Sequence, residues 1–192
     1  MNEQKIWFVS DVHFFHNNIL KFCPATRHGE TALEMNEYIV QAWNSKVHRR
    51  DIVYNLGDVS FGSVKNTDEV LSRLNGQIHL IYGNHDNMIR QNKGLRERFA
   101  SVQDVKEIKV TLADGTKQDI VMNHFAQRVW NKAHYGAWHL YGHSHGDLES
   151  EPYFKSMDVG IDARPLGDMC PWSLDEIAEI MATRPALGHH SM

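Results

Sequence analysis

The chain has 192 residues, of which 42% are hydrophobic and 23% charged, and its formal net charge is −4. These values are typical of one soluble globular domain, and the acidic balance argues against a protein that coats nucleic acid. No run approaches the roughly 18 apolar residues of a membrane span, and the start does not resemble a signal peptide. Cys23 and Cys170 lie outside any CxxC spacing, so we expect a reduced, cytoplasmic protein. The predicted domain covers 1–192, with 183–192 as a flexible tail.

Apolar and β-branched runs predict several strands. Strands are expected at 6–9, 51–56, 78–82 and 156–161, and Asp-Gly between alternating residues predicts a hairpin within 105–122. In open α/β sheets, ligands bind beyond the carboxyl ends of the strands. The residues that directly follow these strands are therefore the first candidates for a functional site.

Helical periodicity predicts two longer helices, each opened by a capping box. Thr31 and Glu34 open the first, and Ser173 and Glu176 open the second. A shorter helix is expected over 67–74. The basic segment 87–101 is interpreted as a solvated helix-and-loop face, with a phosphate-attracting rim as the alternative. The loop that follows the hairpin, 125–137, is long enough to reach over a site.

The segment Gly142-His143-Ser144-His145 places two histidines two residues apart, after an apolar stretch. In an extended strand their side chains would point to opposite faces. A turn flanked by glycine lets both converge, because glycine tolerates backbone angles that other residues resist. Two converging imidazoles suggest a metal site.

Matching ligand types follow the other predicted strands. The full set is Asp11, His13, Asp58, Asn84, His124, His143 and His145. Carboxylate, imidazole and amide groups suit manganese, iron, zinc or nickel, and the lack of a thiolate argues against a structural zinc site. Seven ligands are too many for one ion but suffice for two if one carboxylate bridges them. Asp58 is the best bridging candidate, because its strand supplies no other ligand.

These motifs resemble those of the calcineurin-like metallophosphoesterases. The blocks that carry the resemblance are Asp11-x-His13, Gly57-Asp58, Gly83-Asn84-His85-Asp86, His124 and Gly142-His143-Ser144-His145. They follow the family's order and span nearly the whole chain. The opening segment 11–19 also resembles short phosphoesterases of bacteria and phages, with Phe15 where glycine is more usual.

The resemblance implies an α/β fold, a four-layer αββα sandwich in which helices flank two mixed β-sheets, with a dinuclear metal site at the strand ends. One ion would take Asp11, His13 and His145, the other would take Asn84, His124 and His143, and Asp58 would be shared. A hydroxide bridging the two ions would attack the phosphorus. His85 would stabilise the transition state or protonate the leaving group, and Asp86 would orient His85 through a hydrogen bond.

We therefore expect an enzyme that uses two divalent or transition metal ions, manganese being favoured, to hydrolyse phosphodiesters. The compact chain leaves little room for a cap domain, which favours an open site for nucleotides, cyclic nucleotides or nucleic-acid ends. A phosphomonoesterase or protein phosphatase with the same core is the alternative. A further alternative is a metal-bearing interaction scaffold without catalysis. No membrane and no obligate protein partner are expected.

Three residues are candidate substrate contacts: His16, Arg27 and His134. For His16 the alternative is support of its own loop, and for the other two it is a structural or solvated position.

Overall fold

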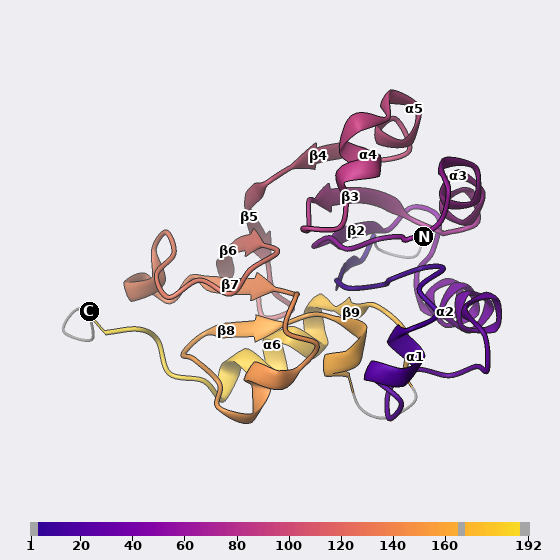
Figure 1. The fold of residues 1–192 in the computed structure, drawn as a ribbon. Helices are drawn as coiled ribbons and strands as arrows, with labels where there is room; N and C mark the ends of the chain where they lie inside the picture. The colour runs from indigo at the N-terminus through magenta and orange to yellow at the C-terminus, as the bar shows by residue number, and fades with distance from the viewer. Residues whose placement is uncertain (1–3, 165–167, 189–192) are drawn as a thin grey trace.

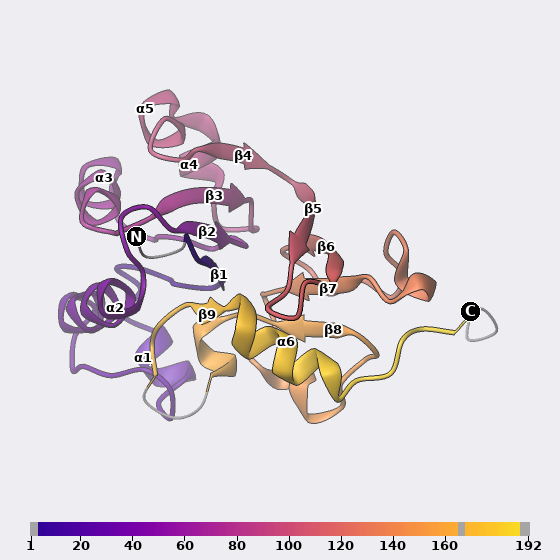
Figure 2. The same ribbon diagram turned by 180° about the vertical axis from the view of Figure 1, so that it is seen from behind.

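Two β-sheets that pack face to face form the centre of the protein (Figures 1 and 2), seen in a computed structural model that describes residues 4–164 and 168–188. The sheets have the strand orders β4-β3-β2-β1-β9 and β5-β6-β7-β8. The strands are β1 (Ile6–Val9), β2 (Ile52–Asn55), β3 (Gln77–Ile81), β4 (Ser101–Gln103), β5 (Val105–Thr111), β6 (Lys117–Asn123), β7 (Trp138–Tyr141), β8 (Ser156–Asp158) and β9 (Trp172–Ser173). Strands β1 to β4 run parallel, as do β6 to β8, whereas β9 and β5 are antiparallel to their neighbours. Both sheets are therefore mixed, which confirms the predicted α/β fold.

Alternation along the strands divides the apolar core into two layers. Trp7 of β1 belongs to the layer beneath the helices α2 (Ala32–Lys46) and α3 (Val64–Ser72), whereas its neighbour Phe8 belongs to the layer between the two sheets. The inner layer also includes residues of α6 (Leu174–Ala182). Because successive side chains of a strand point to opposite faces, one short apolar strand supplies both layers.

The capping residues predicted from the sequence lie at the helix starts. Ser173 and Glu176 form a complete capping box at α6. At α2 the Thr31 hydroxyl accepts the N–H of Glu34, but the Glu34 carboxylate accepts the N–H of Glu30 rather than that of Thr31. The capping box predicted at α2 is therefore incomplete.

The remaining helical elements are short. They are α1 (Ile19–Phe22), α4 (Asn87–Gln91), α5 (Lys93–Arg96) and the 3₁₀ turns η1 (Ala133–Tyr135), η2 (Asp147–Ser150) and η3 (Ile161–Ala163). Within the described ranges, no helix combines the length and the apolar character that crossing a membrane would require.

The loop between β6 and β7 covers the outer face of the second sheet. Trp130 and its neighbours in this loop pack with Val121 of β6 and with Leu187. The sequence allows this loop to reach over the site. Most of the loop instead packs away from the predicted ligands. Leu187 belongs to the predicted tail, whose last residues, 189–192, lie outside the described part of the chain.

The basic segment after β3 forms α4 and α5, and two of its arginines make ion pairs with neighbouring carboxylates. Arg90 pairs with Asp104, and Arg98 pairs with Asp68 through two hydrogen bonds of 2.6 and 2.7 Å. These pairs offset the charge of the segment and favour the solvated face over the phosphate-attracting rim.

Candidate metal centre

The carboxyl ends of five strands meet where the two sheets join. Ser10, just after β1, forms a parallel bridge with Gly160, just after β8, so the parallel strands of both sheets end on the same side of the molecule. The loops after β1, β2, β3, β6 and β7 carry the seven predicted ligands. Parallel strands thereby gather residues that lie more than a hundred positions apart in sequence.

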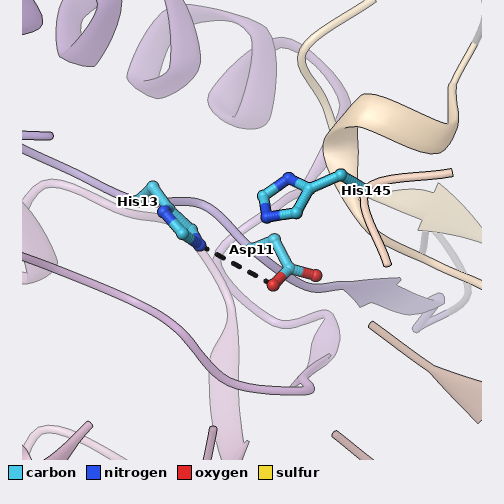
Figure 3. A group of neighbouring side chains, drawn as sticks. All are labelled: Asp11, His13 and His145. Carbon is cyan, nitrogen blue, oxygen red and sulfur yellow. Dashed lines mark ion pairs between the residues drawn. The ribbon is translucent and has the colours of Figure 1, made fainter. Parts of the chain in front are cut away.

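The first ligand group consists of Asp11, His13 and His145, each of which offers a donor atom within 4.8 Å of the others. Figure 3 shows the three side chains turned toward a common point, with an ion pair of 3.7 Å between His13 Nε2 and Asp11 Oδ1. Asp11 and His13 are buried, and Asp11 Oδ1 and both ring nitrogens of His13 have no hydrogen-bond partner among the described residues. Buried polar atoms without partners are rare, and a bound ion is one explanation for them. The donor set therefore fits a metal ion.

The second group consists of Asp58, His124 and His143, whose donor atoms also lie within 4.8 Å of one another. Asn84 adjoins this group, because its Oδ1 lies 3.0 Å from His124 Nε2. The other ring nitrogen of His124, Nδ1, lies 2.7 Å from the carbonyl oxygen of Leu56. Donation from Nδ1 to this carbonyl leaves Nε2 free to bind an ion.

Asp58 belongs to the second group but also lies close to the first. Its Oδ2 is 3.7 Å from His13 Nε2 and 3.5 Å from His124 Nε2, one histidine from each group. Its Oδ1 accepts the backbone N–H of His85 at 2.8 Å. One oxygen is therefore used to hold the loop, and the other faces both groups.

Five of the seven predicted ligands have left-handed backbone conformations: Asp11, His13, Asp58, His143 and His145 have φ between 49° and 68°. Residues other than glycine rarely adopt such angles, and strain of this kind concentrates at functional sites. The sequence suggests that glycine provides the unusual backbone angles of the His-x-His turn. In the structure the two histidines themselves adopt such angles. Gly142 is required for space, since a Cβ atom there would lie 1.9 Å from the Ser10 hydroxyl oxygen and 2.5 Å from Asp11 Oδ2.

Two buried carboxylates that sequence reasoning missed hold this turn in place. Asp162 accepts from Nδ1 of His145 at 2.7 Å and from Arg27 at 2.6 and 2.7 Å. Asp158 accepts from the Ser144 hydroxyl at 2.6 Å and from the Gly146 N–H at 2.9 Å. Asp158 lies in the predicted strand 156–161, and Asp162 follows it directly. The rule that ligands bind beyond the ends of strands could therefore have drawn attention to both.

The charges of the site follow from burial and from these contacts. Burial alone would raise the pKa of Asp58, but the neighbouring imidazoles of His124 and His13 hold it well below its usual range. Burial opposes a charge on His145, yet the Asp162 carboxylate outweighs that effect and raises the pKa of His145 to about 10. The pKa of His143 is lowered, first by burial and then by the charge of His124. The Asp58 carboxylate therefore stays negatively charged and can face a cation.

The predicted role of Asp86 in orienting His85 is wrong. The Asp86 carboxylate is buried and accepts the backbone N–H groups of Gly83, Asp58 and Val59 at 2.8 to 2.9 Å. It therefore ties the loop after β3 to the loop after β2. His85 itself is 47% exposed, and its Nε2 lies 4.0 Å from Asp58 Oδ2.

Arg27 cannot contact a substrate as predicted, because its side chain is fully buried. Besides Asp162, it donates to the carbonyl oxygens of Asp11 and Val12 at 2.6 and 2.8 Å, and so fixes the loop that carries the first ligands. The structure places His134 in η1, before the start of β7, whereas the ligand His143 follows the end of that strand.

His16 is the one predicted substrate contact that lies beside the site. Its ring centroid is 5.4 Å from that of His13 and 4.2 Å from that of Phe61. The pKa of His16 is lowered, chiefly by burial and then by the charge of His13. A half-buried, largely neutral imidazole at the rim can donate or accept a hydrogen bond.

Comparison with known proteins agrees with this geometry. Residues 5–152 match the calcineurin-like phosphoesterase superfamily domain. The uncharacterized protein MJ1445 of Methanocaldococcus jannaschii is 31% identical over 188 residues, which cover 94% of this chain and 93% of that protein. The Gene 66 protein of Mycobacterium phage L5 is 28% identical over 181 residues, or 82% of this chain and 86% of that protein. The crystal structure of AQ665 from Aquifex aeolicus, a protein of unknown function, superimposes with a TM-score of 0.68 at 20% identity and covers 93% of this chain and 100% of the other.

The chain belongs to the calcineurin-like phosphoesterase superfamily. Its relatives include phage proteins, as the resemblance of its opening segment to short phage phosphoesterases implies. Membership supports a hydrolase that acts on phosphate esters with the help of divalent metal ions.

Proposed function

We propose that this protein is a phosphodiesterase that uses two metal ions. The observation that carries the proposal is the position of Asp58 Oδ2, within 3.7 Å of a histidine from each ligand group. In this assignment Asp11, His13 and His145 hold one ion, and Asn84, His124 and His143 hold the other. Nitrogen and oxygen donors of this kind suit manganese, with iron, zinc or nickel as alternatives.

The metal ions supply the electrostatic part of the chemistry. When bound, two such ions lower the pKa of a water molecule and offset the charge of the phosphoryl oxygens. The chain must hold those ions at a fixed separation, and its short, internally bonded loops are suited to that. Asp86 and Asp162 each fix one ligand-bearing loop through hydrogen bonds that involve backbone groups or a ligand histidine.

His85 is the residue assigned to the leaving group. It is exposed and stands at the edge of the site, with Nε2 4.0 Å from Asp58 Oδ2. When the bond from phosphorus to the leaving oxygen breaks, an imidazolium here donates its proton to that oxygen, which gives a typical rate gain of about 10²- to 10⁴-fold. Its backbone N–H, bonded to Asp58, keeps the side chain beside the metal ligands.

An open site favours a diester over a monoester. His85 and His143 are exposed, and a cavity of about 670 Å³ begins at His143 and His145 and continues past Phe22. Groups on both sides of a phosphate can therefore lie on the protein surface while the phosphate contacts the metal ions. Both cysteines are free thiols, in keeping with the cytoplasmic location predicted from the sequence.

A metal-reconstituted comparison of esters tests the proposal. Chelated protein should be inactive, and manganese should restore hydrolysis of methyl 4-nitrophenyl phosphate to a higher kcat/KM than that of 4-nitrophenyl phosphate. Preference for the second ester would favour the phosphomonoesterase. Full activity without metal would overturn the proposal, and two bound ions without turnover of any ester would favour the non-catalytic scaffold.

The His85→Ala variant tests the assignment of the leaving-group residue. We expect kcat to fall by about 10²- to 10³-fold, with the metal content unchanged. His48→Ala is the matched control, because His48 is also exposed but precedes β2 at the opposite end of the sheet. Equal activity of the two variants would remove His85 from the mechanism.

A further inference from the structure

Three phenylalanines are exposed to solvent, and all three border the candidate metal centre. Phe22, Phe61 and Phe125 are 71%, 39% and 47% exposed, whereas the other five phenylalanines of the chain are buried or half-buried. An exposed phenyl ring forgoes the stabilisation that burial would provide. Apolar rings gathered on one part of a surface indicate a binding site rather than a contribution to folding.

Phe61 and Phe22 lie on the side of the first ligand group. The Phe61 ring centroid is 5.1 Å from that of His13, 4.8 Å from that of His85 and 4.2 Å from that of His16. His16 in turn lies 6.4 Å from Phe22. The rings of Phe61, His16 and Phe22 therefore follow one another beside the first ligand group.

Phe125 lies on the side of the second ligand group. Its ring centroid is 5.0 Å from that of His124 and 4.7 Å from that of His143. It comes from the loop after β6, whereas Phe61 comes from the loop after β2 and Phe22 ends α1. Three separate segments thus bring phenyl rings to the two sides of one site.

The cavity beside the site has a mixed lining. Phe22, Ile19 and Leu148 supply apolar surface, and the side chains of Ser144 and Asp147 supply polar surface. A lipid chain would gain nothing from the polar part. A flat heterocycle can lie on a phenyl ring and direct its polar edge to the exposed Asp147 carboxylate, which accepts hydrogen bonds.

We propose that Phe22, Phe61 and Phe125 bind nucleobases on the two sides of the scissile phosphate. The substrate is then a phosphodiester that joins two nucleosides. This inference rests on the proposed phosphodiesterase function and assigns its substrate class. Stacking on aromatic side chains is a general way to bind single strands with little sequence preference.

The same geometry selects a single strand over a duplex. In a duplex each base is covered on both faces by its neighbours, so no face is open to a protein ring. Stacking on Phe125 or Phe22 requires bases that are unstacked from each other, as single strands and dinucleotides provide. The acidic net charge of −4 agrees with a short contact of this kind rather than a long phosphate track.

Calorimetric titration tests the inference without relying on turnover. The metal-loaded His85→Ala protein is titrated with a thymidine dinucleotide that contains one phosphodiester, and separately with dimethyl phosphate. The two ligands carry the same charge and differ only in their nucleosides. We expect the dinucleotide to bind at least about 10-fold more tightly. Equal affinities would overturn the inference.

Substitutions of the phenylalanines identify the contacts. On the His85→Ala background, Phe125→Ala and Phe22→Ala should each weaken dinucleotide binding by roughly 5- to 150-fold and leave dimethyl phosphate binding almost unchanged. Phe125→Tyr keeps a ring and should bind like the parent, whereas Phe125→Leu should bind like Phe125→Ala. Tyr38→Ala is the control for loss of an exposed ring, because Tyr38 lies in α2 and is 51% exposed.

The contrary outcomes are distinct. An equal loss of affinity for the dinucleotide and for dimethyl phosphate would mean that the rings only position the histidines. Full affinity in Phe125→Leu would mean that the contact is apolar and needs no aromatic ring. Either result overturns nucleobase stacking. A duplex that binds as tightly as a single strand overturns the preference for single strands. Failure of the proposed function shows separately, as absence of turnover of methyl 4-nitrophenyl phosphate by the wild-type protein, and leaves the binding comparison valid.

Discussion

The two ligand groups differ in burial and in the way their histidines are held. In the first group Asp11 and His13 are buried, and the carboxylate of Asp162 fixes the ring of His145. In the second group Asp58 and His124 are also buried, but Asn84 and His143 are exposed. A buried site with a carboxylate behind its histidine loses less order on binding and feels less screening by water.

We therefore infer that the first group binds its ion more tightly and that the second exchanges its ion more readily. The exposed side of the centre is also where His85 stands and where substrate can approach. The first group would keep its metal ion, and the second group would leave room for a phosphate ester to approach.

Loss of the Asp58 carboxylate, which both groups share, should affect metal binding at both groups. Asp58→Asn keeps the shape of the side chain and the oxygen that accepts the His85 N–H, but it removes the charge between the two groups. We expect kcat/KM to fall by at least about 10³-fold and metal content to drop below two ions per chain. Atomic absorption after dialysis measures the second quantity, and two retained ions would contradict a bridging role.

Loss of an exposed ligand should affect the second group alone. His143→Ala removes one imidazole beside His124 and leaves the first group complete. We expect one ion per chain to remain tightly bound and activity to fall by about 10²-fold, because one ion alone offers part of the charge stabilisation. Calorimetric titration with manganese should then show one binding event where the wild-type protein shows two.

Loss of the supporting carboxylate should weaken the first group alone. Asp162→Asn removes the charge behind His145, and such substitutions typically reduce metal affinity by about 10- to 100-fold. The tighter of the two binding events should move toward the weaker one. Asp104→Asn removes an exposed carboxylate that pairs with Arg90 rather than with a ligand histidine and is the control; the same change in both variants would contradict the role of Asp162.

The variant Asp162→Asn also leaves the Arg27 guanidinium buried with a weakened partner, which destabilises folded proteins. Its unfolding temperature must therefore be measured with and without metal. A variant that folds and still binds the first ion as tightly as the wild-type protein would show that the two groups do not differ in the way inferred.

Acid should weaken the fold through a histidine outside both groups. His139 of β7 is buried, and burial lowers its pKa to about 4. Its ring accepts the Gln127 N–H at 3.0 Å and lies 3.1 Å from the carbonyl oxygen of Val121. In the unfolded chain a histidine takes up a proton near pH 6.5.

The stability that neutral His139 provides is therefore complete above about pH 6.5 and lost as the pH falls toward 4. Between pH 7 and 4.5 the loss should be about 2 kcal/mol. His139→Gln should remove this component, which urea titrations of the metal-free protein at several pH values can measure. An unchanged pH dependence would exclude His139 as its source and leave the site histidines to explain it.

Much of the site could be predicted because it depends on residue type and order. Asp11, Asp58 and His124 each lie within three residues of the end of an apolar strand, and parallel strands bring such positions to one edge of the sheets. His143 and His145 also lie in different clusters of potential ligands in the structure. The resemblance to a known family supplied this division, since spacing alone left the two histidines on one ion.

The contacts of long side chains could not be predicted in the same way. Arg27 is polar and lies in a loop, which is typical of a substrate contact, yet its guanidinium is buried against Asp162. Asp86 follows His85 directly, yet its carboxylate turns back to the loop of Asp58. Which partner a flexible side chain selects depends on groups from distant segments, and neighbouring positions in sequence do not reveal it.

The sequence by itself determined the strand ends, the ligand types and the family, because local periodicity and residue chemistry are written along the chain. Only the tertiary structure decided the greater exposure of the second ligand group, the support from Asp158 and Asp162, and the placement of three phenyl rings around the centre. Burial and contact arise when separate segments pack together. Burial and contact depend on the close packing of the two sheets, because packing places each side chain in one of the several environments that the sequence alone would allow.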